Sequence, residues 1–147
     1  MVLNKMKNVK GQSGFTIVEL LIVIVVIGIL AAITIVAYSG ITARANTVKA
    51  QSNAESAQKV AETYNADLGL YPTMAQLTGY TTGSAQLPSG ITLQATAPAI
   101  GNGLTTLSYV PKGTTGGCIG WFNFTAGVPW YTAVGNAVVP AGSLSCS

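Results

Sequence analysis

The most regular feature of the hydrophobic pattern is an apolar run from Phe15 to Val36. At the rise of an α-helix this run spans roughly 33 Å, which is enough to cross the hydrocarbon core of a bilayer. Glu19 is the only charged residue in the run, and the next charge is Arg44. A carboxylate in such a segment costs free energy unless it has a partner or lies near the interface. The pattern therefore predicts a membrane-spanning helix over residues 15–38, with Glu19 as a candidate functional residue.

The helical pattern continues over residues 39–68, where it becomes amphipathic. From Thr42 onward this segment is rich in Ala, Gln, Asn and Ser and has no Pro or Gly, which favours continued helix. Apolar residues recur at helical spacing in one stripe at Ala54, Ala57, Ala61, Tyr64 and Leu68, and in an earlier stripe at Ile41, Ala45 and Val48. Gly69 and the Tyr71-Pro72 pair should end the helix, because glycine suits the position after a helix and proline cannot continue it. We therefore predict one helix of about 54 residues, roughly 80 Å long.

The remainder of the chain divides into a connecting region and a small sheet. Residues 69–103 hold many glycines and prolines among short apolar pieces, which indicates little regular structure. Residues 104–147 contain three runs typical of strands, at Leu104–Val110, Cys118–Thr125 and Trp130–Val139. A sheet of three or four antiparallel strands cannot bury its face alone, so the small-residue stripe of the helix is its expected partner. The predicted fold class is α+β, a long helix packed on a carboxyl-terminal antiparallel sheet.

The charge of the chain is concentrated in its first residues. The 147 residues carry a formal charge of +3, which Lys5, Lys7 and Lys10 account for. Residues 1–14 therefore indicate a cytoplasmic leader that follows the positive-inside tendency. A secretory signal cut at Ala43-Arg44-Ala45 is the alternative, but the apolar run is longer than a signal core.

The titratable residues argue against an enzyme. The sequence has no histidine, and no carboxylate side chain follows Asp67. Imidazole-based catalysis and an oxygen-ligand metal cage in the carboxyl-terminal half are thereby excluded, so we expect no catalytic residues, metal or cofactor. Lys112 is the only basic residue after Lys59, which argues against a nucleic-acid partner. Cys118 and Cys146 are an even pair in a segment expected outside the cytoplasm, and a disulfide between them is predicted.

The segment Gly14-Phe15-Thr16-Ile17-Val18-Glu19-Leu20, followed by the long apolar helix, resembles the class III signal of type IV pilins and related pseudopilins. The resemblance implies cleavage between Gly14 and Phe15 by a prepilin peptidase and N-methylation of Phe15. It also implies that Glu19 pairs with the Phe15 amine of a neighbouring subunit during assembly. Gly14 has no Cβ, which lets the scissile backbone lie extended and close to the peptidase carboxylates.

The same resemblance implies a long helix packed on an antiparallel sheet with a disulfide-closed carboxyl-terminal loop. Partners would be other copies joined through the N-terminal helices, the peptidase and methyltransferase, and a pilus assembly platform in the cytoplasmic membrane. The subunit would await assembly among membrane lipids as a single-pass precursor, and then become part of an extracellular filament. Gly28 matches the family's helix-weakening glycine, whereas Val36 stands where many pilins have a proline.

Three functions are compatible with this sequence. The leading hypothesis is a structural pilin subunit of a type IV pilus-like filament. The alternative is a pseudopilin of a type II secretion system, although such proteins typically build a calcium loop from acidic residues that this chain lacks. A minor pilin or adhesin is the third, with a binding surface formed by Trp121, Phe122, Phe124, Trp130 and Tyr131. Alternating aromatics of this kind are more often core and cross-strand packing.

Overall fold

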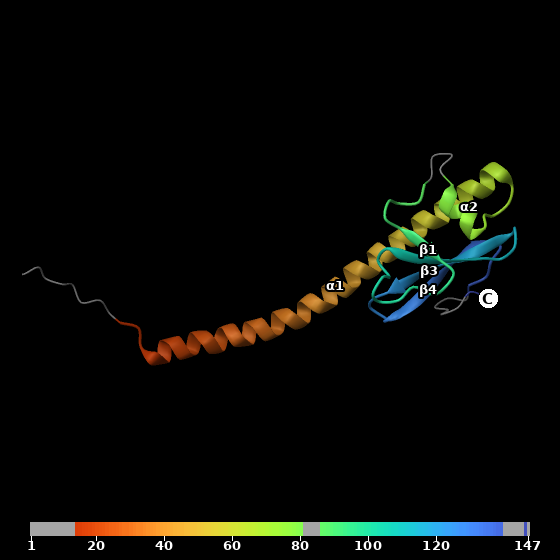
Figure 1. Cartoon of the computed structure of the whole chain (residues 1–147). Coiled ribbons are helices and arrows are strands. Elements are labelled where there is room, and N and C mark those ends of the chain that lie inside the picture. The colour runs from red at the N-terminus through yellow and green to blue at the C-terminus, as the bar shows by residue number, and fades with distance from the viewer. Residues whose placement is uncertain (1–13, 81–85, 140–145, 147) are drawn as a thin grey trace, which may run out of the picture. The chain divides into compact units, whose positions relative to one another are not determined.

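The computed structural model describes residues 14–80, 86–139 and 146 (Figure 1). In chain order the elements are α1 (Ile17–Leu68), α2 (Met74–Gly79), β1 (Thr92–Gln94), β2 (Thr106–Pro111), β3 (Gly116–Asn123) and β4 (Val128–Gly135). The chain divides into two units, Met1–Tyr38 and Ser39–Ser147, and each is described by itself.

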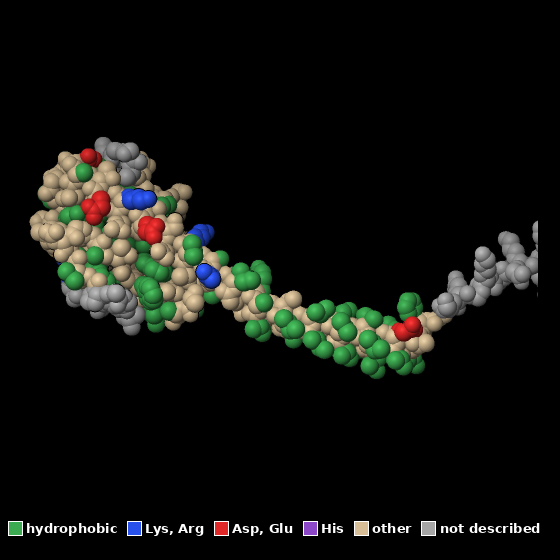
Figure 2. All heavy atoms as spheres, turned by 180° about the vertical axis from the view of Figure 1, so that it is seen from behind, with side chains coloured by type: hydrophobic (Ala, Val, Ile, Leu, Met, Phe, Trp, Pro, Cys, Tyr) green, Lys and Arg blue, Asp and Glu red, His purple; other side chains and the backbone are tan. Residues whose placement is uncertain are grey.

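The described part of the first unit is dominated by the amino-terminal portion of α1. Its large apolar side chains are exposed, from Ile17 at 84% to Val36 at 73% (Figure 2). An 18-residue window of α1 has a mean hydropathy of 3.3 and no burial, and α1 is the one helix among the described residues that could cross a membrane by length and composition. So large an apolar surface indicates contact with lipid or with other apolar surfaces.

In the second unit α1 ends where the sequence predicts. The helix stops at Leu68, and Gly69 has a φ of 74°. The Gly69 N–H donates to the Asn65 carbonyl at 2.8 Å, which satisfies one of the last carbonyls of the helix. Glycine adopts this left-handed conformation without the penalty that a Cβ would bring.

One face of α1 forms half of the core of the second unit. Its buried residues are Ala50, Ala54, Ala57, Val60, Ala61 and Tyr64. Figure 1 shows the sheet on one side of this part of α1. The buried sheet residues that pack in the same cluster are Leu107, Tyr109, Ile119, Trp121 and Val134. Alanine at four of the six helix positions keeps the helix face small, which allows close packing on the larger residues of the sheet.

The sheet has the order β1-β2-β3-β4. Strands β2, β3 and β4 pair antiparallel, as expected, and the predicted α+β class is confirmed. Strand β1, however, pairs parallel with β2, so the sheet is mixed rather than wholly antiparallel. Both β1 and α2 come from the connecting region, where the sequence indicated little regular structure. A three-residue strand is too short to show alternation, and α2 rests on a capping box between Thr73 and Gln76.

Strand β3 is buried along its whole length. Successive side chains of a strand point to opposite faces, so Ile119 and Trp121 lie in the α1 cluster while Cys118 lies on the other face. Cys118 forms a disulfide with Cys146, which confirms the predicted bridge. The bridge therefore holds the carboxyl-terminal end of the chain to the face of β3 opposite α1.

The packing predicted from the apolar pattern of α1 is wrong at two places. Leu68, included in the predicted packing stripe, is 56% exposed. In the earlier stripe Ile41 and Val48 are also exposed, at 69% and 59%. Val48 lies nine residues before the buried Ala57, which at 3.6 residues per turn is a rotation of about 180° from the buried face. The two stripes therefore lie on opposite sides of α1, and only the later one contacts the sheet.

Candidate processing and assembly segment

The first turn of α1 is held by Thr16 and Glu19. The Thr16 backbone N–H donates to Glu19 Oε2 at 2.8 Å, and the Thr16 hydroxyl donates to the same oxygen at 2.7 Å. In return the Glu19 N–H donates to Thr16 Oγ1 at 3.2 Å. This reciprocal arrangement is a capping box, which satisfies backbone donors that the helix itself leaves unpaired. It also places a negative charge at the positive end of the helix dipole.

The capping box leaves part of the Glu19 carboxylate available. Both donors from Thr16 use Oε2, and the described residues supply no cation to this carboxylate. A carboxylate can accept about four hydrogen bonds through its two oxygens, so Oε1 can still receive a cationic donor. Thr16-Ile17-Val18-Glu19 has the Thr-x-x-Glu spacing of a capping box, a signal in the sequence that the predicted helix start did not use.

Gly14 and Phe15 precede the helix and are exposed. A Cβ built on Gly14 would meet nothing within 4 Å. No contact among the described residues therefore requires glycine at position 14.

Gly28 and Val36 both lie inside the continuous helix α1. A Cβ on Gly28 would also meet nothing within 4 Å, so no contact within this chain requires glycine there. The predicted weakness at Gly28 remains a prediction, since it concerns the helix in a filament.

The aromatic residues considered for an adhesin surface mostly serve packing. Trp121 and Phe122 are each 5% exposed. Trp121 is paired across the sheet with Trp130, with ring centroids 5.7 Å apart, and Phe122 contacts Phe124 at 5.0 Å. Tyr131 is half-buried. Within this group Trp130 is 37% exposed and Phe124 is half-buried against the core, which does not amount to a built aromatic binding surface.

Glu62 of α1 joins the helix to two other parts of the second unit. Its Oε2 accepts a hydrogen bond from the Tyr71 hydroxyl at 2.7 Å, and its Oε1 accepts one from the Gly135 N–H at 3.3 Å. The hydrogen bond to Glu62 raises the pKa of Tyr71 above its usual value. Gln58, one turn earlier, donates to the Ala133 carbonyl at 3.2 Å. Two side chains of α1 thus bind backbone groups of β4, and no local pattern in the sequence signals this contact.

Comparison with known proteins agrees with the motif at the helix start. A family model described as the prokaryotic N-terminal methylation motif matches residues 9–35. The chain is 43% identical over 61 residues to the type IV major pilin protein PilE of Neisseria gonorrhoeae, which covers 42% of this chain and 36% of that pilin. It is 47% identical over 53 residues to a fimbrial protein of Pseudomonas aeruginosa, covering 36% of this chain and 34% of that protein.

A fimbrial protein of Eikenella corrodens, EcpC, is 43% identical over 61 residues, or 40% of its length. The chain thus matches well under half the length of these curated relatives. No solved structure matches it. The matched methylation motif includes the start of α1. The relatives are type IV major pilins and fimbrial proteins, which confirms the resemblance inferred from residues 14–20.

Proposed function

We propose that this chain is the structural subunit of a type IV pilus-like surface filament. The observation that carries the proposal is an unburied apolar helix that begins at Ile17, inside the methylation motif matched over residues 9–35. In water this surface is unstable, and a bundle of identical helices would bury it as a bilayer does. The similarity to pilins and fimbrial proteins supports the same reading.

Before assembly the chain would be a single-pass precursor in the cytoplasmic membrane, among its lipids. Its lysine-rich residues 1–14 would stay in the cytoplasm, and residues from 39 onward would lie outside. The Cys118–Cys146 disulfide supports this orientation, because disulfides persist in oxidising compartments. A prepilin peptidase would cut between Gly14 and Phe15, N-methylation of Phe15 would follow, and an assembly platform would add the subunit to the filament.

Glu19 would then have two roles. One oxygen keeps the first turn capped through Thr16, and the other accepts the Phe15 amine of a neighbouring subunit. A charge pair of this kind offsets the cost of burying either charge in an apolar filament core. The cap orients the carboxylate toward the amino-terminal end of its own helix.

The second candidate is a pseudopilin of a type II secretion system. The absence of any carboxylate side chain after Asp67 disfavours it, because a calcium loop would need several. The two candidates differ in their response to a chelator. We expect the outer unit of this chain to melt at the same temperature with and without chelator, whereas earlier melting in chelator would favour a pseudopilin.

The deciding experiment is N-terminal sequencing and mass spectrometry of filaments sheared from cells. The mature protein should have 133 residues, since 147 less the 14 of the leader remain, and should begin with methylated Phe15. A Gly14→Leu variant should accumulate as uncleaved precursor in the membrane, because its side chain would block the peptidase cleft. A mature terminus at Asn46, or recovery of the chain only from the membrane while surface filaments of another subunit persist, would refute the proposal.

A further inference from the structure

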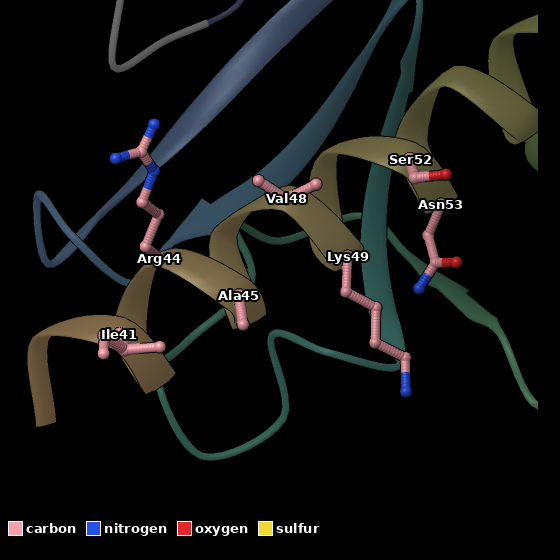
Figure 3. A pocket seen from close by; sticks show the side chains of 7 residues that line it. All are labelled: Ile41, Arg44, Ala45, Val48, Lys49, Ser52 and Asn53. Carbon is pink, nitrogen blue, oxygen red and sulfur yellow. The ribbon is translucent and has the colours of Figure 1, made fainter. Parts of the chain in front are cut away.

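The exposed stripe of α1 at Ile41, Ala45 and Val48 forms the floor of a shallow groove with a volume of about 590 Å³. The groove is further lined by Arg44, Lys49, Ser52 and Asn53. Figure 3 shows the Arg44 and Lys49 side chains extending in opposite directions, with Ala45 and Val48 between them. The groove thus combines an apolar floor with a cation on either side.

This groove lies entirely within the second unit and on the side of α1 opposite the core. Val48 is 59% exposed although valine at this helical spacing is typical of a packed face. Among the described residues, no carboxylate lies within ion-pair distance of Arg44 or Lys49. Among the described residues, therefore, no apolar surface covers the floor of the groove and no carboxylate pairs with its two cations.

The same face of α1 carries an acidic residue that fits the groove. Glu55 is exposed and accepts one hydrogen bond, from Gln51 at 3.0 Å. No cation of the described residues lies within ion-pair distance of it, although Lys59, one turn further along α1, lines the same surface hollow. It follows Arg44 by eleven residues, which at 3.6 residues per turn brings both to within about 20° of the same helix face. The other two acids of this unit on α1 are engaged within the chain, since Glu62 binds Tyr71 and Asp67 binds Tyr80.

We propose that a second copy of this chain docks on this groove and places its Glu55 between Arg44 and Lys49. The inference rests on the proposed function, because a filament requires neighbouring helices to run parallel. Two parallel copies with no axial shift would bring like charges together, which is unfavourable. A shift of roughly 9 Å brings Glu55 level with Lys49, and one of roughly 16 Å brings it level with Arg44. The charges of the outer helix thereby select a staggered neighbour, independently of Glu19.

A lipid surface fits the length and the charges of the groove less well than a second copy of the helix does. From Ile41 to Asn53 the groove covers roughly 18 Å of helix, about three times the depth of a headgroup layer. Anionic headgroups would neutralise the cations but would leave part of the apolar floor in water. A second helix offers both an apolar surface and a carboxylate over that length.

Charge reversal in cells that make filaments tests the inference. The Arg44→Glu, Lys49→Glu double variant and the single Glu55→Lys variant should each lower the yield of sheared filaments by about tenfold, because every subunit repeats the contact. Combining the three substitutions should restore the yield to near the wild-type level. Lys112→Glu, which changes a charge on an exposed residue of the sheet region, is the matched control and should have no effect.

A cross-linking measurement keeps the test informative if the reversed variants assemble poorly for another reason. Cells co-expressing an Ala45→Cys subunit and a Ser52→Cys subunit, both of which keep Arg44, Lys49 and Glu55, should give mixed dimers in intact filaments when treated with a short bismaleimide. Replacing the second partner by Thr114→Cys, at an exposed site in the turn before β3, should give none. Absence of mixed dimers from intact filaments overturns the inference while leaving the proposed function in place.

Two further outcomes separate the alternatives. Normal filaments from the double variant, together with weaker retention of the precursor in vesicles of phosphatidylglycerol, would assign the groove to lipid and overturn the inference. Absence of this chain from all surface filaments would instead refute the proposed function. In every variant, N-terminal sequencing and the Cys118–Cys146 disulfide report whether the subunit was processed and folded.

Discussion

Tyr109 offers the sharpest test of how the outer unit is held together. Its side chain is fully buried in the core, and its hydroxyl donates to the Pro72 carbonyl at 2.8 Å. This bond joins strand β2 to the segment that follows α1. Burial raises the pKa of Tyr109 to about 12, and the neighbouring Tyr71 contributes to the rise. The informative perturbation is Tyr109→Phe, which removes the hydroxyl and keeps the ring.

The expected effect has two parts with different pH dependence. Losing the hydrogen bond and leaving the Pro72 carbonyl unpaired should lower the free energy of unfolding by about 1–2 kcal/mol at neutral pH. In the wild type, the unfolded chain releases the tyrosine proton near pH 10 while the folded chain keeps it until about pH 12. Stability is therefore fully present below pH 10 and falls between pH 10 and 12, by about 2–3 kcal/mol from this residue. Phenylalanine has no such proton, so the difference between the two proteins should vanish or reverse by pH 12.

The measurement is urea unfolding of the full chain in detergent micelles, from pH 8 to 12. Fluorescence of Trp121 and Trp130, in β3 and β4, reports the sheet directly. Tyr131→Phe is the control, because the described residues provide no hydrogen-bond partner for the Tyr131 hydroxyl, and it should keep the alkaline fall. If the free energies of unfolding of the wild type and Tyr109→Phe, plotted against pH, stay parallel from pH 8 to 12, the hydroxyl does not hold its proton in the folded state.

Three further predictions follow from the helix and the disulfide. Glu19→Ala should give processed, membrane-held subunit and little or no filament by electron microscopy, and normal filaments would contradict the pairing with Phe15. Reducing the Cys118–Cys146 bridge, which closes 146 − 118 + 1 = 29 residues, should lower stability by about 3.6 kcal/mol and loosen the sheet before the helix, as hydrogen exchange would reveal. In filaments imaged by electron cryo-microscopy, any break in α1 should centre on Gly28, where helix propensity is lower by about 1 kcal/mol than for alanine; a break at Val36 would contradict this reasoning.

The parts of this protein that follow from local chemistry were predictable from the sequence. A carboxylate in an uncharged apolar run, a glycine before it and lysines upstream indicated the segment that matches the N-terminal methylation motif. Gly69 and Pro72 predicted the end of the helix within one residue, because each restricts the backbone in a way that depends on no distant contact. Three strands were recognised because each is long enough to show its own pattern and is bounded by glycine or proline.

The tertiary structure decided which of several chemically similar residues are buried or hydrogen-bonded. Ile41 and Ala57 belong to one amphipathic helix, yet one is exposed and the other buried, because the sheet covers only one side of α1. Glu55 and Glu62 are equally polar in sequence, but only Glu62 lies where a backbone N–H of β4 and the Tyr71 hydroxyl reach it. Strand β1 exists because β2 offers an edge to pair with, not because three residues favour a strand. Periodicity fixes the spacing of side chains along an element, whereas burial depends on segments far away in the chain, and only folding brings those segments together.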